Sequence, residues 1–278
     1  MIAYFILAHQ QPTMFQRMLS AIYDSNNLYL IHVDSKNSDM ISLVHQISNK
    51  FNNLRVMPSR YLTFAGWSLV QIELEAIKEL LNWSSDWSHF INLSGQDMPL
   101  VTQEQISDFL KENSNKNFIN YQIASEADRR IHFNSYFVED FGQLKRLGER
   151  NPFEEYFQDN IKAYRGSQWK IITRKLAEYS VTSSFSYELQ DYFKYVLIPD
   201  ETFFPTLILN SPESTETIIN NNLRYITYVR KENGFAGASI ITMSDLLHIF
   251  NSDSLFARKF DDQIDSTIIS LIESTLKK

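Results

Sequence analysis

The first 110 residues of this 278-residue chain alternate short apolar runs with amphipathic stretches, and this alternation limits the folds that the chain can adopt. The continuous hydrophobicity of the short runs is typical of strands buried on both faces of a sheet. Between them, apolar residues recur every three or four positions, which predicts helices with one buried face. The predicted strands cover 2–8, 28–33, 54–57 and 89–93, and the predicted helices cover 12–22, 40–51, 70–81 and 102–110. Four successive βα units predict an α/β fold with a mostly parallel central sheet flanked by helices.

Three of these helices begin with a local signal. Pro12 suits a first helical turn, where its missing N–H leaves no hydrogen bond unmade. Ser68 is the predicted cap of the third helix. Thr102 and Gln105 form the Thr-x-x-Gln pattern of a capping box, which predicts the start of the fourth.

The second half of the chain is less regular. A strand followed by a helix is predicted over 166–179, short strands over 196–198 and 225–229, and helices near 244–250 and 264–276. No internal repeat, low-complexity run or Ser/Gly linker divides the sequence. We therefore expect a single compact unit, with 1–112 as its first half and 113–278 as its second.

Composition excludes several classes of function. The chain has no cysteine, which excludes a disulfide framework, thiolate zinc sites, iron–sulfur clusters and a cysteine nucleophile. A formal net charge of -7 argues against a broad surface for nucleic acid or anionic membranes. The N-terminal apolar run lacks a basic flank, and no stretch approaches the roughly 20 apolar residues of a membrane span. We expect a cytoplasmic protein, with any membrane association being peripheral.

Polar residues gather where the predicted strands end. His9 follows the first strand after Ala8, Asp34 follows the second strand, and the fourth strand leads into Asp97. In a parallel α/β sheet, ligands bind outside the carboxyl ends of the strands, so these residues are candidates for a ligand site. The residues alone leave two readings open, because Asp34 could cap a loop and His9 could be a packed histidine bonded to a backbone carbonyl.

Six segments match, in order, those of a known enzyme family. They are Leu30-Ile-His-Val-Asp34, Trp67-Ser-Leu-Val-Gln71, Phe90-Ile-Asn-Leu-Ser-Gly-Gln-Asp-Met-Pro-Leu100, Gly166-Ser-Gln-Trp169, Pro199-Asp-Glu-Thr-Phe-Phe204 and Leu255-Phe-Ala-Arg-Lys-Phe-Asp261. With these segments the chain resembles the core-2/I-branching β-1,6-N-acetylglucosaminyltransferases and the related peptide O-xylosyltransferases, glycosyltransferase family 14. The resemblance covers nearly the whole chain. It implies a GT-A-type nucleotide-sugar-binding fold in a single glycosyltransferase domain, with 1–112 as the nucleotide-binding half and 113–278 as the acceptor-binding and catalytic half.

The resemblance also implies an activity. The implied enzyme is an inverting, metal-independent transferase that moves a sugar from a UDP-sugar to an acceptor hydroxyl, with GlcNAc preferred and xylose or glucose as alternatives. The animal relatives carry a membrane anchor and disulfides, whereas this chain resembles a bacterial cytosolic version. That version implies surface polysaccharide synthesis, with a glycan or lipid-linked oligosaccharide as acceptor. A protein that keeps the fold and binds a nucleotide or carbohydrate without catalysis is the alternative from another class.

Inverting transfer needs one carboxylate to deprotonate the attacking hydroxyl. The resemblance assigns this role to Glu201, with the neighbouring Asp200 as second candidate. Taken alone, Glu201 could equally be a carboxylate that stabilises a helix N-terminus. The chain has no Asp-x-Asp triplet of the kind that holds a divalent metal, so neither a metal nor another cofactor is expected beside the donor. A metal-dependent enzyme centred on Glu126 and Asp128 is the remaining alternative.

The departing diphosphate needs positive charge, which basic side chains can supply in place of a metal. The resemblance assigns this role to Lys259, with Arg258 beside it as a helper. The family's second phosphate cation, an arginine, aligns without gaps on Ala236, so that Arg230 and Lys231 are the nearest cations that could replace it. From spacing alone, Lys259 could also be a solvated surface lysine.

The resemblance places uracil and ribose at the first βα edge, with Ala8, His9 and Asp34 as contacts. It places Asp97 beside the donor sugar and Trp169 at the border of the sugar pocket, where the ring could stack on a sugar face. Taken alone, Asp97 could be a turn acid that caps the next segment, and Trp169 could be a core residue.

Overall fold

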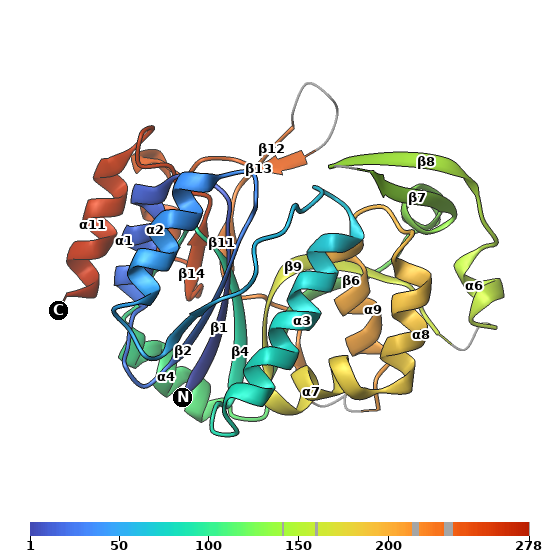
Figure 1. Cartoon of the computed structure of the whole chain (residues 1–278), viewed down its shortest axis with the longest axis horizontal. Coiled ribbons are helices and arrows are strands. Elements are labelled where there is room, and N and C mark those ends of the chain that lie inside the picture. The colour runs from blue at the N-terminus through green and yellow to red at the C-terminus, as the bar shows by residue number, and fades with distance from the viewer. Residues whose placement is uncertain (141, 159–160, 213–216, 231–235, 278) are drawn as a thin grey trace. The chain divides into compact units, whose positions relative to one another are not determined.

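The structure is a computed structural model that describes residues 1–140, 142–158, 161–212, 217–230 and 236–277 (Figure 1). The chain forms two compact units. The first unit comprises Met1–Pro58, Asn92–Ser114 and Leu223–Lys278, and the second comprises Ser59–Ile91 and Asn115–Asn222. These units differ from the predicted halves, because residues 59–91 belong to the second unit and residues 223–278 return to the first. The division of roles between 1–112 and 113–278 stays a prediction.

The first unit is built on parallel strands. Its elements are β1 (Ile2–Ala8), α1 (Pro12–Ile22), β2 (Leu28–Val33), α2 (Ser38–Ser48), β3 (Leu54–Val56), the end of β4 (His89–Ser94), β5 (Asp97–Pro99), α4 (Gln103–Glu112), β11 (Arg224–Ile226), β12 (Tyr228–Arg230), β13 (Ala236–Ala238), the 3-10 turn η3 (Met243–Asp245), α10 (Leu246–Phe250), β14 (Phe256–Arg258) and α11 (Ser266–Leu276). Strand β1 pairs in parallel with β2, from Ala3 opposite Leu28 to Ala8 opposite Val33, and β2 pairs in parallel with β3. Every residue of β1 and β2 is buried. The predicted α/β class with a mostly parallel sheet is confirmed.

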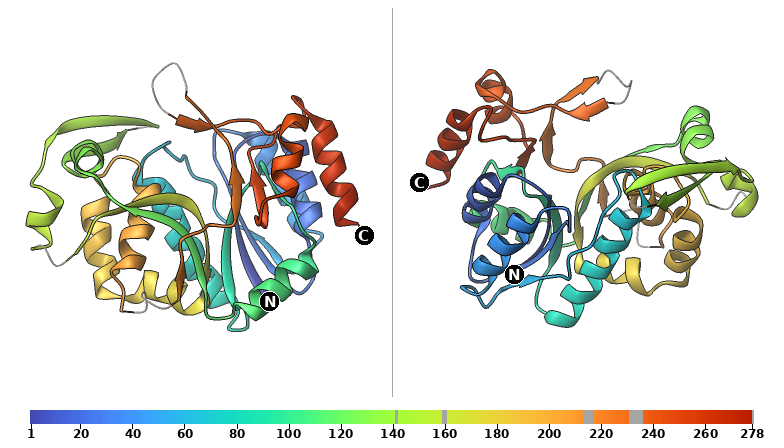
Figure 2. Two further views of the ribbon diagram at one scale, coloured as in Figure 1. Left: turned by 180° about the vertical axis from the view of Figure 1, so that it is seen from behind. Right: turned by 45° about the horizontal axis from the view of Figure 1, so that its top comes forward.

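Helices α1 and α2 lie side by side on one face of these strands (Figures 1 and 2). The predicted stripe of α1 is buried, comprising Phe15, Met18, Leu19 and Ile22. The predicted capping box of Thr102 and Gln105 opens α4. Among the described residues, no helix has the length and apolar character that a membrane crossing needs.

A smaller sheet of the first unit joins the last part of the chain to β5. Strand β14 lies between β11, to which it is parallel, and β5, to which it is antiparallel. In this register Arg258 stands opposite Asp97, and Phe256 stands opposite both Pro99 and Arg224. Two segments that the resemblance assigned to the donor site are therefore neighbours in one sheet.

The second unit is organised around one long strand, β9. Its elements are α3 (Trp67–Trp83), the start of β4, β6 (Asn117–Ile123), α5 (Glu126–Asp128), the π turn η1 (Arg129–Phe133), β7 (Ser135–Asp140), β8 (Gln143–Glu149), α6 (Phe153–Tyr156), β9 (Tyr164–Thr173), α7 (Arg174–Thr182), α8 (Ser184–Phe193), the 3-10 turn η2 (Pro199–Glu201), α9 (Phe203–Leu209) and β10 (Ile218–Ile219). Strand β9 is antiparallel to both β4 and β6, and β10 runs parallel to β6. Helix α9 packs on β9. Helices α3, α7 and α8 pack around α9 (Figure 1).

Two local predictions for the second unit are wrong. Ser68 does not cap α3, which begins at Trp67; instead its backbone N–H donates to the carboxylate of Glu139, 2.6 Å away. The apolar run 196–198 is not a strand, because its amides donate to separate segments and Ile198 takes a left-handed conformation with φ of 54°. Helix α8, for which no prediction was made, fills the preceding stretch.

Gly166 lies where strands β9 and β6 come unusually close. A Cβ atom on Gly166 would stand 1.9 Å from the carbonyl oxygen of Asn120, next to an irregularity in the β6–β9 register between Ile119 and Tyr121. Backbone cannot yield as a flexible side chain can, so only glycine fits here without moving a strand.

We expect Gly166→Ala to lower the free energy of unfolding by about 1–3 kcal/mol, because the added methyl group forces two strands apart. Gly95→Ala is the matched control, since its Cβ would meet the ring of Phe15 at an ordinary 3.4 Å. Urea unfolding followed by circular dichroism measures both. Equal stabilities of the two variants would contradict the close approach.

Candidate active site

The carboxyl ends of β1 and β2 bring three predicted residues together in the first unit. Ala8 is buried, and its carbonyl oxygen accepts a 2.9 Å hydrogen bond from the backbone N–H of Asp34. The Asp34 carboxylate accepts from the backbone N–H of Lys36 at 3.0 Å and lies 3.4 Å from the Lys36 ammonium. Its side chain is only 8% exposed, so its orientation is well defined.

His9 stands among cations at the same strand ends. Partial loss of hydration lowers the pKa of His9, and the charges of Lys259, Arg258 and Lys36 lower it further, against the opposing effect of Asp34. A neutral imidazole is therefore favoured at neutral pH. We call Lys36, Arg258 and Lys259 the cation cluster; such a cluster is suited to an anionic ligand.

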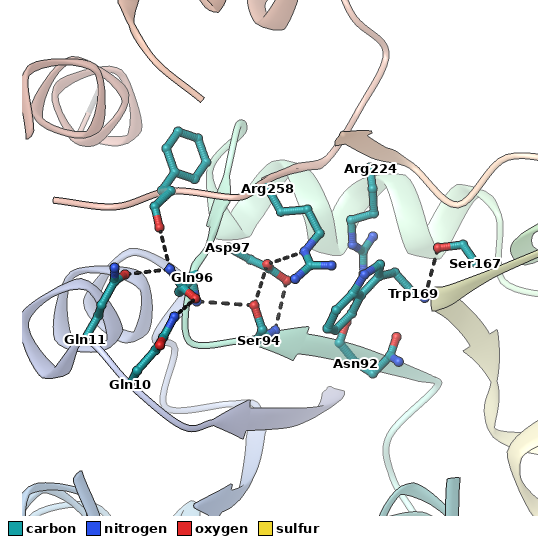
Figure 3. Close-up of polar contacts among 11 residues, drawn as sticks. Gln10, Gln11, Asn92, Ser94, Gln96, Asp97, Ser167, Trp169, Arg224 and Arg258 are labelled. Atoms are coloured by element: carbon teal, nitrogen blue, oxygen red, sulfur yellow. Dashed lines mark hydrogen bonds and ion pairs between the residues drawn. The ribbon is translucent and has the colours of Figure 1, made fainter. Parts of the chain in front are cut away.

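A set of amide side chains holds the segment after Lys259 in place (Figure 3). The Gln96 amide donates to Gln11 at 2.6 Å and to the Phe260 carbonyl at 3.0 Å, and it accepts from Gln10 at 2.8 Å. Gln11 in turn donates to the carboxylate of Asp261. We call these five residues the glutamine clamp. Because Phe260 and Asp261 directly follow Lys259, the clamp fixes the backbone that carries two of the cations.

Asp97 is fully buried and its oxygens are engaged. It accepts from the backbone N–H of Ser94 at 2.9 Å, from the Ser94 hydroxyl at 2.8 Å and from Nε of Arg258 at 3.1 Å (Figure 3). Nearby, burial lowers the pKa of Arg224 to about 10, an effect that the Asp97 charge opposes. Asp97 therefore orients Arg258; its predicted place beside the donor sugar stays a prediction.

The two candidates for the second phosphate cation lie in the β12–β13 hairpin or next to it. Arg230 is the last residue of β12 and stands directly opposite Ala236 on β13. Lys231 lies outside the described residues. The backbone thus puts Arg230 across the ladder from the position on which the family's arginine aligns.

In the second unit, Glu201 ends the 3-10 turn η2 with a side chain that is 37% exposed. One of its oxygens, Oε2, lies 3.4 Å from the Arg165 guanidinium, whose other terminal nitrogen contacts Asp128 at 2.9 Å. Burial raises the pKa of Glu201, and the Arg165 charge opposes that rise. Asp128 is held by the backbone N–H and hydroxyl of Ser125.

Asp200 differs sharply from its neighbour Glu201. Burial, followed by the adjacent Glu201 charge, raises the pKa of Asp200 to about 7. Its Oδ1 is buried without a hydrogen-bond partner in the described part of the chain. A hydrogen bond from its own backbone and the charge of Lys170 oppose this rise of the pKa. Lys170 lies 2.6 Å from Glu73 in an ion pair with exposures of 0% and 2%.

Two other predicted positions belong to the second unit. Trp169 on β9 is 5% exposed, and its backbone N–H donates to the Ser167 hydroxyl at 3.2 Å (Figure 3). Its sugar-stacking role stays a prediction. Asp128, of the alternative metal site with Glu126, is already paired with Arg165 and Ser125. Among the described residues no group of three His, Cys, Asp or Glu side chains is arranged to hold a metal ion.

Comparison with known proteins identifies the family. The family model described as "Branch: Core-2/I-Branching enzyme" matches residues 2–249. This chain belongs to the core-2/I-branching enzyme family. It is 30% identical to a xylosyltransferase of Ciona intestinalis over 293 aligned residues, and 32% identical to human xylosyltransferase 1 over 237.

These alignments cover 99% and 83% of this family member but only 34% and 24% of the two relatives, so the chain spans about a third or less of their length. Among solved structures, a 4-diphosphocytidyl-2C-methyl-D-erythritol synthase from Anaerococcus prevotii matches with a TM-score of 0.36 and 13% identity, over 89% of this chain and 93% of that chain.

Several side chains of this core-2/I-branching family member were not predicted to belong to the site. Arg165 contacts partners 36 and 37 positions away in the sequence, so no local motif marks it. Gln10 and Gln96 each lie close to a strand end, and this position is the sequence feature that could have marked them as site residues. Lys36 lies two positions after Asp34, just beyond the end of β2.

The raised pKa of Asp200 predicts a pH-dependent stability. The unfolded chain ionises this carboxyl from about pH 4, whereas the folded chain keeps it protonated until about pH 7, so the wild type loses stability as the pH rises through this window. Asp200→Asn removes that loss. Its melting temperature relative to wild type should therefore rise between about pH 4 and 7 and level off above.

The control is Asp108→Asn on α4, whose carboxylate is 57% exposed. Because this carboxylate is exposed, the substitution should change the melting temperature only slightly. A difference for Asp200→Asn that does not change with pH would rule out the raised pKa.

Proposed function

We propose that this chain is an inverting, metal-independent glycosyltransferase that moves a sugar from a UDP-sugar to a hydroxyl of a glycan acceptor. The observation that carries the proposal is the cation cluster beside His9 at the carboxyl ends of β1 and β2. The glutamine clamp holds the segment that carries two of its cations, Arg258 and Lys259. Strand ends of this kind are where α/β proteins bind nucleotides, and a cluster of cations suits a diphosphate.

The proposed donor site lies in the first unit. Asp34, with an oriented carboxylate next to Ala8, accepts hydrogen bonds from the ribose or the uracil imide. Lys259 and Arg258 neutralise the diphosphate, and Arg230 takes the place of the family's missing arginine. Since the negative charge on the diphosphate grows as the bond to the sugar breaks, these cations stabilise the transition state more than the bound donor.

The proposed base lies in the second unit. Glu201 takes the proton of the acceptor hydroxyl through the oxygen that does not face Arg165. The hydroxyl oxygen then forms a bond to the anomeric carbon, the bond from that carbon to the diphosphate breaks, and its electron pair leaves with UDP. Asp200 is less suited to this role, because its Oδ1 is buried and therefore less accessible to an acceptor hydroxyl.

GlcNAc is the proposed donor sugar, and xylose is the second candidate. The names of the relatives support xylose, since both are xylosyltransferases at about 30% identity. Glucose is the third candidate for the donor sugar. The acceptor is proposed to be a glycan or a lipid-linked oligosaccharide in the synthesis of a surface polysaccharide.

A screen of UDP-sugars for UDP release, with and without excess EDTA, tests this proposal. At least one of UDP-GlcNAc, UDP-xylose and UDP-glucose should release UDP at the same rate in EDTA. Glu201→Gln should lower kcat by at least about a hundredfold with little change in UDP affinity, because it keeps the size of the side chain and removes the proton acceptor.

Glu126→Gln is the matched control and should keep the wild-type rate. UDP binding without any turnover would favour the non-catalytic alternative. Activity that EDTA abolishes and manganese restores would overturn the metal-independent mechanism and point to Glu126 and Asp128.

Lys259→Ala should lower kcat strongly and weaken UDP binding in calorimetry, because UDP keeps the diphosphate that this ammonium neutralises. Its melting temperature should barely move, since exposed or half-exposed lysines usually contribute less than about 0.5 kcal/mol to stability. Lys50→Ala, at an exposed lysine, is the control. Normal turnover and normal UDP binding by Lys259→Ala would remove this residue from the site.

A further inference from the structure

We infer that Arg165, anchored by Asp128, is a positioning residue that holds the Glu201 carboxylate by one oxygen and places a fixed positive charge beside it. This inference rests on the proposed role of Glu201 as base. Arg165 on β9 and Asp128 on α5 thereby join a centre for which the sequence indicated only Glu201 and its neighbour Asp200.

The geometry is that of a bridge between two carboxylates. One terminal nitrogen of Arg165 lies 2.9 Å from Oδ1 of Asp128, and the other lies 3.4 Å from Oε2 of Glu201. A planar guanidinium can serve two acceptors at once because its donors form a rigid fork, which a lysine ammonium on its flexible stem does not reproduce. Since the bridge uses Oε2, it leaves Oε1 of Glu201 to take the proton of the acceptor.

Both ends of the Arg165 side chain are fixed. Asp128 accepts from the hydroxyl and backbone N–H of Ser125 at 2.6 and 3.0 Å and is only 13% exposed. On the backbone side, Arg165 pairs with Gln122 of β6 and precedes Gly166, where β9 and β6 come closest. A guanidinium anchored in this way loses less freedom on pairing with Glu201 than an ordinary surface arginine does.

Arg165 is also the charge that opposes the effect of burial on Glu201. Burial raises the pKa of Glu201, and Arg165 is the cation that counteracts this rise. His132 on η1 lies beside the bridge, but burial and then the Arg165 charge lower its pKa, so it adds no second cation at neutral pH. Asp200 on the same turn carries little charge below pH 7.

Two further charged groups act on Asp200. Lys170 on β9 and Glu73 on α3 form a buried ion pair whose charges act on Asp200 in opposite directions. The charge that decides when Glu201 ionises is therefore that of Arg165, and its loss should be visible as a change in pH dependence.

The test is Arg165→Gln, with two readouts. The first is the titration of the Glu201 side-chain carboxyl by carbon-13 NMR, assigned by the signal that disappears in Glu201→Gln. Without the cation, the titration midpoint should rise by about one pH unit. The second is the pH profile of kcat, whose acid limb should move upward by the same amount, because the base is lost wherever Glu201 is protonated.

Arg165→Lys separates charge from geometry and guards against a folding defect. The lysine keeps the charge, so the titration midpoint should stay near that of the wild type. The ammonium lacks the two separate terminal nitrogens that face Asp128 and Glu201. We therefore expect kcat to fall by about tenfold while KM for the donor stays within about twofold. Arg129→Gln is the matched control, since Arg129 pairs with Glu154 at 2.9 Å and not with Glu201.

A Glu201 midpoint that is the same in the wild type and in Arg165→Gln would overturn the inference, whatever the activity. A shifted midpoint with an unchanged kcat and pH profile would also overturn it, because Arg165 would then have no part in the reaction. Absence of UDP release by the wild type from every UDP-sugar would instead overturn the proposed function. In that case the NMR titration still decides whether Arg165 holds Glu201 ionised.

Discussion

The close backbone contact between Gly166 and the carbonyl of Asn120 fixes strand β9, and the charged groups of the second unit depend on that strand. Arg165 precedes the contact, and Lys170 follows it on the same strand. A shift of β9 would therefore move the cation that faces Glu201 and the cation that stabilises a buried Glu73 at the same time. Breaking a buried ion pair such as Lys170–Glu73 is strongly destabilising, because one charge is left without compensation. The same backbone feature thus supports both stability and the proposed chemistry.

The sequence was most informative where burial alone decides the structure. The runs 2–8 and 28–33 became strands because their residues, apart from His32, are apolar enough to be buried on either face. Local pairs such as the Thr102 capping box were also predictable, since both partners lie within one turn. Ser68 is not the cap because α3 already begins at Trp67, and Glu139, 71 positions away, accepts the hydrogen bond from the Ser68 N–H group. Such long-range competition leaves no trace in a window of sequence.

Prediction of the candidate site from the sequence is limited in the same way. Motifs of a few residues named Glu201 and Lys259, because family segments are short and continuous. The side chains that orient those residues come from distant parts of the chain. Arg165 reaches Glu201 across 36 positions, and Gln96 reaches Phe260 across 164. The sequence could therefore predict which groups carry the chemistry, whereas the geometry that directs them required the fold. The roles themselves remain proposals.

The glutamine clamp differs in kind from the charges that it supports. Apart from the bond from Gln11 to Asp261, its hydrogen bonds join neutral amide and carbonyl groups. Such bonds are little affected by dissolved salt, whereas attraction between a cation and a phosphate weakens as the Debye length shortens. The segment carrying Lys259 is thus held in the same place in dilute and in concentrated salt. A change in ionic strength would alter how strongly this surface attracts an anion without altering its shape.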